Sequence, residues 1–239
     1  MSTEPAYYAR TGTLKGDVLA LLHPPYTAWH LSYILLGAGL AQDLSWTILI
    51  LVLLAFFGGT GISAHALDEL NGRPLSTGFS DRQLKHFALA GFGLALICSL
   101  IGMALISWWV LPLALLGGLL VAAYSLEWWG GMVHTNLGFG LAWGGFPVLV
   151  GYWAQTESVS LAAILASAAA TWLSLAQRGL STPARFIRRK TENARLEFEH
   201  SGSAEEWDRT RLLKSWERPL KALSYASLAL GLALVLRHL

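Results

Sequence analysis

Residues 48–57 read ILILVLLAFF and residues 111–123 read LPLALLGGLLVAA, two stretches that carry apolar side chains in every direction around the chain. About 20 such residues in a helix cross the hydrocarbon core of a bilayer, whereas membrane β-strands alternate apolar and polar side chains. The chain is 54% hydrophobic and 13% charged, against about 25% charged in a soluble domain. We therefore predict an all-α polytopic membrane protein.

About seven membrane-spanning helices account for the apolar runs. They are expected at residues 26–41, 46–67, 84–103, 105–126, 136–154, 158–177 and 218–237. The chain then divides into an N-terminal segment 1–25, a six-helix membrane core 26–177, a charged segment 178–217 and a C-terminal transmembrane helix 218–239.

The basic residues predict the orientation of these helices. With a cytoplasmic N-terminus, 16 of the 17 Lys and Arg residues lie on the cytoplasmic side, and Arg237 is the exception. This asymmetry is typical of multi-pass proteins, so we expect a bilayer-embedded chain, in the plasma membrane of a prokaryote. The net charge of +2 argues against nucleic acid as a partner.

The charged segment 178–217 is the only expected piece of any size outside the membrane. Thr182 and Pro183 match the start of one helix, and Ser203 with Glu206 matches the capping box of another, with Gly202 between the two helices. The segment either lies on the membrane or bundle surface or forms a solvated charged linker.

A charged motif follows the second predicted span, where residues 63–80 read SAHALDELNGRPLSTGFS. His65, Asp68 and Glu69 have the spacing of one helix face, and Mg²⁺ is usually bound by one or two carboxylates together with substrate phosphates. Arg73 could bind a diphosphate through two parallel hydrogen bonds. The alternative is a solvated helix end whose acids pair with Arg73 or Arg82.

Two further polar positions lie next to predicted spans. Glu127 ends the fourth span beside Trp128 and Trp129, and a carboxylate near the membrane is costly enough to favour a function. The tryptophans are typical of an interfacial belt. Asn136 begins the fifth span and could line the mouth of a polar cavity.

On these motifs the chain resembles the UbiA superfamily of intramembrane prenyltransferases over roughly residues 24–190. The most specific match is RPLSTGFS at residues 73–80, which resembles the segment following that family's first acidic motif. The entry HPPY at 23–26, the pair Tyr124-Ser125, and residues 138–147 and 151–156 are also similar.

The resemblance implies a UbiA-like helical bundle in which Mg²⁺ ions hold a diphosphate between two acidic motifs. It places Asp68 as a metal-binding acid, with His65 in the position of the first acid, and Arg73 as the loop arginine. The chain departs from the family at the second motif, since residues 177–185 read QRGLSTPAR and contain no acid.

The sequence therefore predicts a divergent prenyltransferase that joins an isoprenoid diphosphate to a lipid or aromatic acceptor. The expected catalytic residues are Asp68, His65 and Glu127, and Glu69 joins Asp68 and His65 as a metal ligand. The expected substrate-binding residues are Arg73, Tyr124, Asn136 and Arg178. The alternatives are a non-catalytic protein that binds a quinone or lipid or serves as a complex subunit, and a terpene cyclase.

Overall fold

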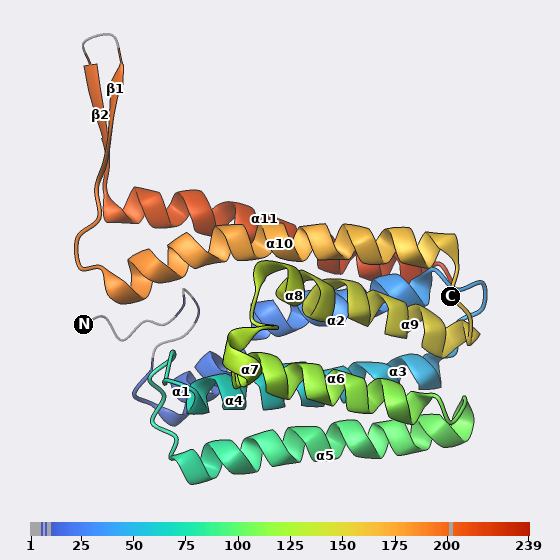
Figure 1. Cartoon of the computed structure of the whole chain (residues 1–239). Coiled ribbons are helices and arrows are strands. Elements are labelled where there is room, and N and C mark those ends of the chain that lie inside the picture. The colour runs from blue at the N-terminus through green and yellow to red at the C-terminus, as the bar shows by residue number, and fades with distance from the viewer. Residues whose placement is uncertain (1–5, 7, 9–10, 201–202) are drawn as a thin grey trace.

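The computed structural model describes residues 6, 8, 11–200 and 203–239. The chain forms a bundle of helices lying side by side along one direction, and a single two-stranded hairpin projects from one end (Figure 1). The N-terminal third supplies α1 (Leu14–Leu22), α2 (Pro24–Gly39), α3 (Trp46–Phe56), the π-helical segment η1 (Phe57–Ala64) and α4 (His65–Leu70).

The remaining elements complete the bundle in chain order. They are α5 (Asp81–Leu105), α6 (Val110–Ser125), the short α7 (Trp128–Gly131), α8 (Asn136–Gly140), the π-helical η2 (Leu141–Gly145), α9 (Phe146–Thr156), α10 (Leu161–Lys190) and α11 (Arg209–Leu236). Strands β1 (Leu196–His200) and β2 (Ser203–Trp207) pair antiparallel between α10 and α11.

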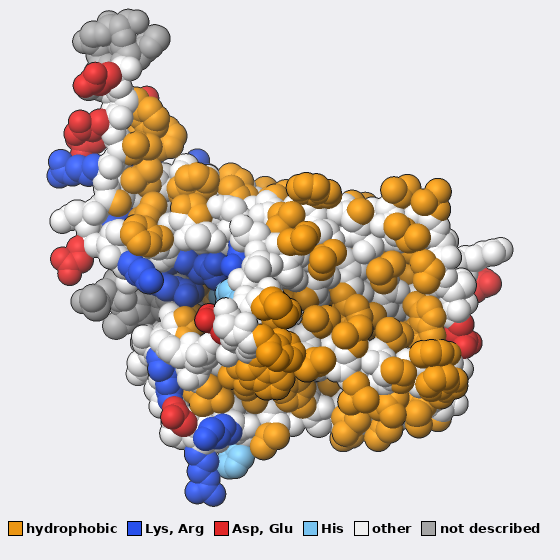
Figure 2. Space-filling model, in the orientation of Figure 1, with side chains coloured by type: hydrophobic (Ala, Val, Ile, Leu, Met, Phe, Trp, Pro, Cys, Tyr) orange, Lys and Arg blue, Asp and Glu red, His pale blue; other side chains and the backbone are white. Residues whose placement is uncertain are grey.

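The apolar helices make this a multi-pass membrane protein. Among the described residues, four helical runs are long and apolar enough to cross a bilayer, namely Trp46–Leu70, Asp81–Leu105, Asn136–Thr156 and Arg209–Leu236. Helix α6 is apolar but shorter. Figure 2 shows hydrophobic side chains over the middle of the bundle and most visible Lys and Arg side chains at the end that carries the hairpin.

Helix α2 lies in the interior of the bundle because glycines let neighbouring helices approach it. A Cβ atom on Gly37 would lie 2.0 Å from the Val148 carbonyl oxygen of α9, and one on Gly231 of α11 would lie 2.7 Å from the Ser32 carbonyl oxygen. Small residues allow such close helix contacts in membranes. Trp29 and Tyr33 of α2 are consequently buried in the core.

The segment 178–217 differs from the prediction at both of its expected helix starts. Helix α10 continues through Pro183 to Lys190, so Thr182 and Pro183 do not begin a new helix. Proline has no backbone N–H, so Pro183 cannot donate the helical hydrogen bond to the carbonyl of Gly179. Gly179 has open space beside it. The uninterrupted helix α10 packs against α11, and the two helices are linked by the Arg188–Glu217 ion pair of 2.6 Å.

Ser203–Glu206 forms a strand rather than a capping box. Residues 196–200 read LEFEH, and this alternation of apolar and acidic residues has the period of a β-strand, which the helical prediction overlooked. Helix α11 begins at Arg209, with Asp208 accepting a hydrogen bond from the Arg211 amide at 2.7 Å. This start is nine residues before the predicted position 218, and Gly202 lies outside the described residues.

Candidate functional site

A π-helical segment brings the second span to the candidate site. The segment η1 contains Gly58, Gly59 and Gly61, and π-helical turns often occur at functional sites. A Cβ atom on Gly58 would lie 2.4 Å from the Gly91 carbonyl oxygen of α5, so the two helices touch through their backbones there. The widened helix ends at His65, whose Nδ1 lies 3.1 Å from the Gly61 carbonyl oxygen.

A cavity of about 340 Å³ lies at the end of the bundle where the basic residues gather. Five of the residues predicted from the sequence line it together, namely His65, Asp68, Tyr124, Glu127 and Arg178. They come from α4, α6, the turn after α6, and α10. Their roles remain predictions, but the tertiary structure places them around one space.

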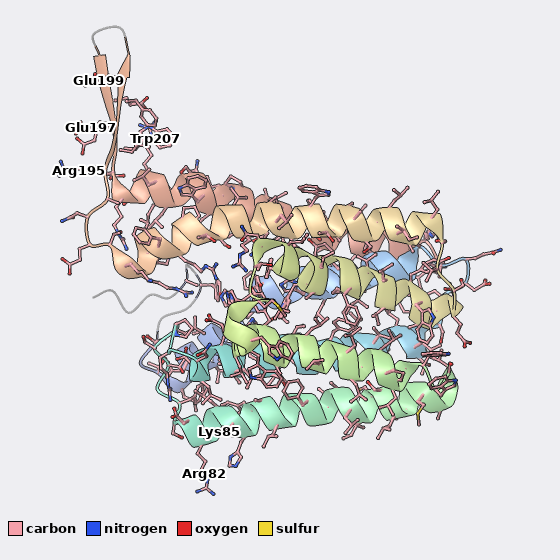
Figure 3. All side chains as sticks on the ribbon, in the orientation of Figure 1. Arg82, Lys85, Arg195, Glu197, Glu199 and Trp207 are labelled. Atoms are coloured by element: carbon pink, nitrogen blue, oxygen red, sulfur yellow. The ribbon has the colours of Figure 1, made fainter. Side chains whose placement is uncertain are left out.

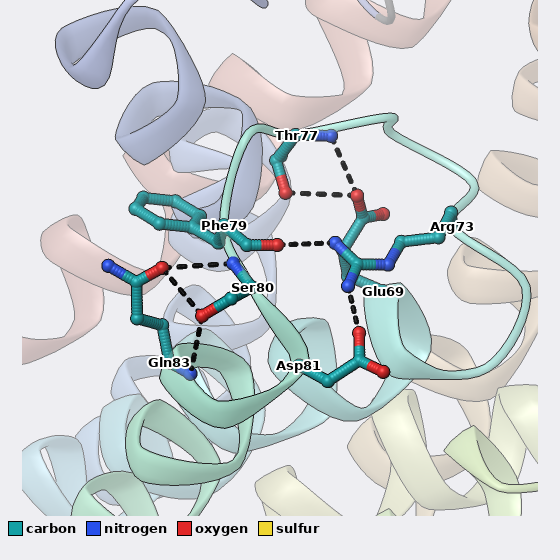
Figure 4. Close-up of polar contacts among 7 residues, drawn as sticks. All are labelled: Glu69, Arg73, Thr77, Phe79, Ser80, Asp81 and Gln83. Atoms are coloured by element: carbon teal, nitrogen blue, oxygen red, sulfur yellow. Dashed lines mark hydrogen bonds and ion pairs between the residues drawn. The ribbon is translucent and has the colours of Figure 1, made fainter.

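Glu69 does not belong to this lining. Its side chain is 0% exposed and accepts a hydrogen bond from the Leu75 amide at 2.8 Å. It also accepts hydrogen bonds from the Thr77 amide at 2.8 Å and the Thr77 hydroxyl at 3.0 Å (Figure 4). The carboxylate therefore folds the following loop around itself. That loop carries Pro74 and Leu75, which form part of the cavity wall.

Arg73 and Asn136 also lie outside the cavity lining. Arg73 donates hydrogen bonds to the Phe79 carbonyl and to Asp81 (Figure 4). Its acidic partner is therefore the first residue of α5 and not one of the helix-end acids that the alternative paired with it. Asn136 is the exposed first residue of α8, next to the N-cap residue Thr135. The predicted substrate-binding roles of Arg73 and Asn136 stay predictions.

The three-residue metal set expected from the motif is not assembled. Within the described ranges, no three His, Cys, Asp or Glu side chains lie close enough together to hold a metal ion. His65 and Asp68 reach the cavity, whereas Glu69 is turned into the loop. Spacing on one helix face allowed all three to converge, but burial of Glu69 separates it from the other two.

Arginines of α10 form the opposite side of the cavity. Arg178, Arg185, Arg188 and Arg189 all line it, because an uninterrupted helix repeats its face every three to four residues. Arg188 forms a 2.6 Å ion pair with Glu217 of α11, with both side chains largely buried. Burial lowers the pKa of Arg189 to about 10, so Arg189 stays charged near neutral pH.

Of the cavity-lining groups on this side, Arg178 is the one that the sequence predicts as a site residue. Arg188, Arg189 and Glu217 also line the cavity, although the helix start expected at Thr182 and Pro183 predicts that Arg188 and Arg189 lie on a different helix from the sixth span. The signal that could have found them is the spacing of the arginines along a helix continuing through Pro183. His23, the first residue of the HPPY entry, also lines the cavity, where burial and then the proximity of His65 lower its pKa well below the usual value.

Aromatic rings form the inner end of the cavity. The rings of Tyr124 and Trp143 have centroids 4.4 Å apart, and those of Phe139 and Trp143 are stacked at 6.0 Å. The guanidinium of Arg178 lies 5.3 Å from the Phe139 ring centroid and donates a hydrogen bond to the Tyr124 hydroxyl. Positive charge and aromatic faces thus meet at one place in the molecule.

A second cavity of about 460 Å³ lies on the other side of these rings, between α3, α5, α6 and α9. Trp143 lines the second cavity, while its neighbours Tyr124 and Phe139 line the first. The second lining is almost entirely apolar, and its few polar members include Thr60 and Ser99. A polar, cationic space and an apolar space therefore share an aromatic wall.

Comparison with known proteins establishes the fold. No protein-family model matches the chain, and no curated protein matches its sequence. A solved structure of a UbiA homolog from Archaeoglobus fulgidus bound to Cd²⁺ is similar, with a TM-score of 0.57 and 18% identity over 92% of this chain and 79% of that chain.

A second structure of a UbiA homolog from Archaeoglobus fulgidus also has a TM-score of 0.57, with 15% identity over 92% of this chain and 99% of that chain. The similarity extends along nearly the whole chain, so the UbiA-like fold expected from the motifs is confirmed. At this level of identity the similarity concerns the fold alone.

Proposed function

From this UbiA-like fold we propose that the protein binds an isoprenoid diphosphate and transfers its prenyl group to a lipid or aromatic acceptor. The observation that carries the proposal is the pair of cavities on either side of an aromatic wall, one lined by four arginines and the other apolar. An amphiphile with an anionic head and a hydrocarbon chain matches both linings. Ligand sites typically combine such apolar walls with a few convergent polar groups.

The diphosphate is assigned to the arginine side of the first cavity. Arg178 and Arg185 both lie on α10, about two helical turns apart. Arg189 follows about one turn later on the same face. Arginine binds phosphate oxygens through strong, charge-assisted hydrogen bonds. An anion in a partly apolar cavity needs such cationic support, because an unpaired buried charge is very costly.

The described residues contain no cluster of three protein ligands that would hold Mg²⁺ without substrate. Asp68 and Glu127 are the acids on the α4 and α6 side of the cavity, and Glu217 is committed to Arg188. Mg²⁺ requires near-octahedral oxygen coordination, commonly from one or two carboxylates plus phosphates. The predicted Mg²⁺ therefore has no three-ligand cluster in the described part of the chain, and the arginines are the cations assigned to the diphosphate.

The reaction assigned to the aromatic wall is a prenyl transfer. The bond between the allylic carbon and the diphosphate oxygen breaks, and the diphosphate leaves with the bonding electrons toward the arginines. The faces of Tyr124, Phe139 and Trp143 stabilise the resulting allylic cation. A nucleophilic acceptor forms the new bond to that carbon and loses a proton, for which Asp68 and Glu127 are the candidate bases.

A non-catalytic lipid-binding protein is the second candidate. The observation that favours it is that Glu69 is held by the loop rather than by the cavity, which leaves few acidic groups for catalysis. A quinone or another lipid would occupy the same two cavities without bond cleavage, as would a subunit that serves a larger complex. A terpene cyclase would release diphosphate from the same site without an acceptor.

The test is to measure binding of geranyl and longer prenyl diphosphates and release of diphosphate, with chelator and with Mg²⁺. The proposal expects binding in the presence of chelator, together with turnover that Asp68→Asn abolishes. Binding without turnover of any acceptor would support the non-catalytic alternative. If the wild-type protein binds no prenyl diphosphate of any length, the substrate assignment is wrong.

We also propose seven spans, with the first cavity opening to the cytoplasm and the bundle lying in a prokaryotic plasma membrane. The asymmetry of basic residues supports this orientation. In intact cells, a cysteine replacing the exposed Glu157 should react with a membrane-impermeant label added outside, and one replacing Arg82 should not. The reverse pattern would contradict the orientation.

A further inference from the structure

The hairpin of β1 and β2 stands clear of the bundle, in contrast to the other described elements (Figure 1). It leaves the ends of α10 and α11 at the basic end of the molecule and runs across the direction of the helices. Because the spanning helices cross the bilayer, a segment running across them at this end extends along the membrane surface.

The two faces of the hairpin differ in chemistry. Leu196 pairs with Trp207 and Phe198 pairs with Glu205, which places these residues on one face. The rings of Phe198 and Trp207 lie 5.2 Å apart, and Leu196 and Phe198 are each 42% exposed. This face therefore presents apolar side chains that the bundle leaves uncovered.

The other face is acidic. Glu197 pairs with Glu206, and Glu199 follows on the same face, while Arg195 lies 3.3 Å from Glu206. In Figure 3, Trp207 lies on the side of the hairpin toward the bundle, whereas Glu197 and Glu199 lie on the opposite side. The apolar face is therefore turned toward the membrane and the acidic face away from it.

The acid on the apolar face is neutralised. Glu205 forms a 2.6 Å ion pair with Arg211 and accepts a hydrogen bond from the Trp207 indole at 3.2 Å. The Arg211 guanidinium lies 4.6 Å from the Trp207 ring centroid. These contacts join the hairpin to the first turns of α11, where Lys214 and Arg218 are also exposed.

We propose that the hairpin is a membrane-interface anchor that rests its Leu196, Phe198 and Trp207 face on anionic phospholipid headgroups. Tryptophan and other amphipathic aromatic side chains favour the headgroup layer, and basic residues beside it attract anionic lipids. The apolar face of the hairpin is turned toward the same side as the apolar surface of the bundle. A bilayer can cover such a face even though no protein surface of matching shape lies against it. This inference does not depend on the proposed reaction.

The test places single nitroxide labels along the hairpin of the full-length chain in a Cys98→Ser background. The protein is reconstituted in nanodiscs of phosphatidylcholine and phosphatidylglycerol. Relaxation by oxygen, which enters the bilayer, is compared with relaxation by a nickel chelate that stays in water. Labels at Phe198→Cys and Trp207→Cys should favour oxygen, and labels at the neighbouring Glu197→Cys and Glu199→Cys should favour the chelate.

Labels that all favour the chelate would overturn the proposal, since the hairpin would stand in water. Labels at 198 and 207 shielded from both reagents would also overturn it, because a second copy or another protein would then cover the face. A second measurement uses the unaltered chain. Amide exchange in residues 196–200 and 203–207 should slow when anionic lipid replaces neutral lipid in the nanodisc, and unchanged exchange would contradict the role of headgroups.

Discussion

The two cavities lie on opposite sides of the same aromatic rings and differ in how their linings arise. The first is lined from α2, α4, α6, α10 and α11 and contains the arginines, Asp68 and three histidines. The second is lined from α3, α5, α6 and α9 and is almost wholly apolar. The charged residues and histidines of the two linings thus all belong to the first cavity, at the basic end of the bundle, because burying a charge at mid-membrane would be costly.

Carboxylates at the first cavity differ in role, because one supports the cavity wall and others face the cavity. Glu69 supports the loop wall of the first cavity through three hydrogen bonds. Glu127 faces the cavity with a side chain that is 57% exposed, and lies 3.7 Å from the His134 ring. Mutations should therefore affect stability at Glu69, ligand affinity at the arginines, and chain-length preference in the second cavity.

The largest effect is expected for Glu69→Gln. The amide cannot accept all three hydrogen bonds of the loop, so the free energy of unfolding should fall by about 3 kcal/mol, as for a lost charged acceptor. Chemical denaturation in detergent micelles measures this change. The matched control is Glu127→Gln, where a surface ion pair contributes about 0–1 kcal/mol. Equal losses in the two variants would remove the distinction between them.

The next effect concerns the first cavity. Arg178→Ala should weaken binding of a prenyl diphosphate about 30-fold, which corresponds to about 2 kcal/mol for one charge-assisted hydrogen bond. Titration calorimetry measures the affinity. Arg82 is the control, because it is basic and at the same end of the molecule but points away from the bundle (Figure 3). A similar loss in Arg82→Ala would indicate general attraction rather than a site.

The second cavity is tested by filling it. Ala114 lines this cavity, and Ala114→Phe should displace about two methylene groups of a long prenyl chain, lowering its affinity about 10-fold. Binding of inorganic diphosphate should be unchanged. Leu89→Phe serves as a control because Leu89 is 67% exposed on the outside of α5. An equal loss of affinity for inorganic diphosphate would mean that the prenyl chain does not occupy this cavity.

A smaller effect of opposite sign is expected for Asp68→Asn. Removing a negative charge beside the bound diphosphate should tighten binding about threefold in the presence of chelator, equivalent to a repulsion of under about 1 kcal/mol. The arginine-based assignment depends on this sign. Tighter binding by the wild type when Mg²⁺ is added, with no such gain in Asp68→Asn, would instead make Asp68 a ligand of a substrate-bridging metal.

The smallest effect is the pH dependence of binding. The pKa of Arg189 is lowered to about 10, so its charge is retained below that value and lost above it. Affinity for a prenyl diphosphate should therefore change less than about twofold from about pH 7.5 to 9, and fall above about pH 10. A fall centred near pH 8 would mean that another group controls the site.

Much of the architecture follows from local sequence patterns. Long apolar runs predict membrane helices because the hydrocarbon core leaves backbone groups no partners outside a helix. The motif at residues 73–80 predicts the UbiA-like fold, which the similar solved structures confirm, whereas the roles of His65, Asp68, Tyr124 and Arg178 in the first cavity stay predictions. These features depend on short-range periodicity and on a motif contained in one loop.

Tertiary structure decided the remaining features, since they depend on contacts between distant segments. Asp68 and Glu69 are chain neighbours with the same chemistry, yet one reaches the cavity and the other is enclosed by the loop at Leu75 and Thr77. Helix α10 packs against α11 and continues through Pro183. This continuous helix places Arg188 and Arg189 at the cavity. Spacing along a helix sets direction, but only packing decides which side chain is buried and which one faces a ligand.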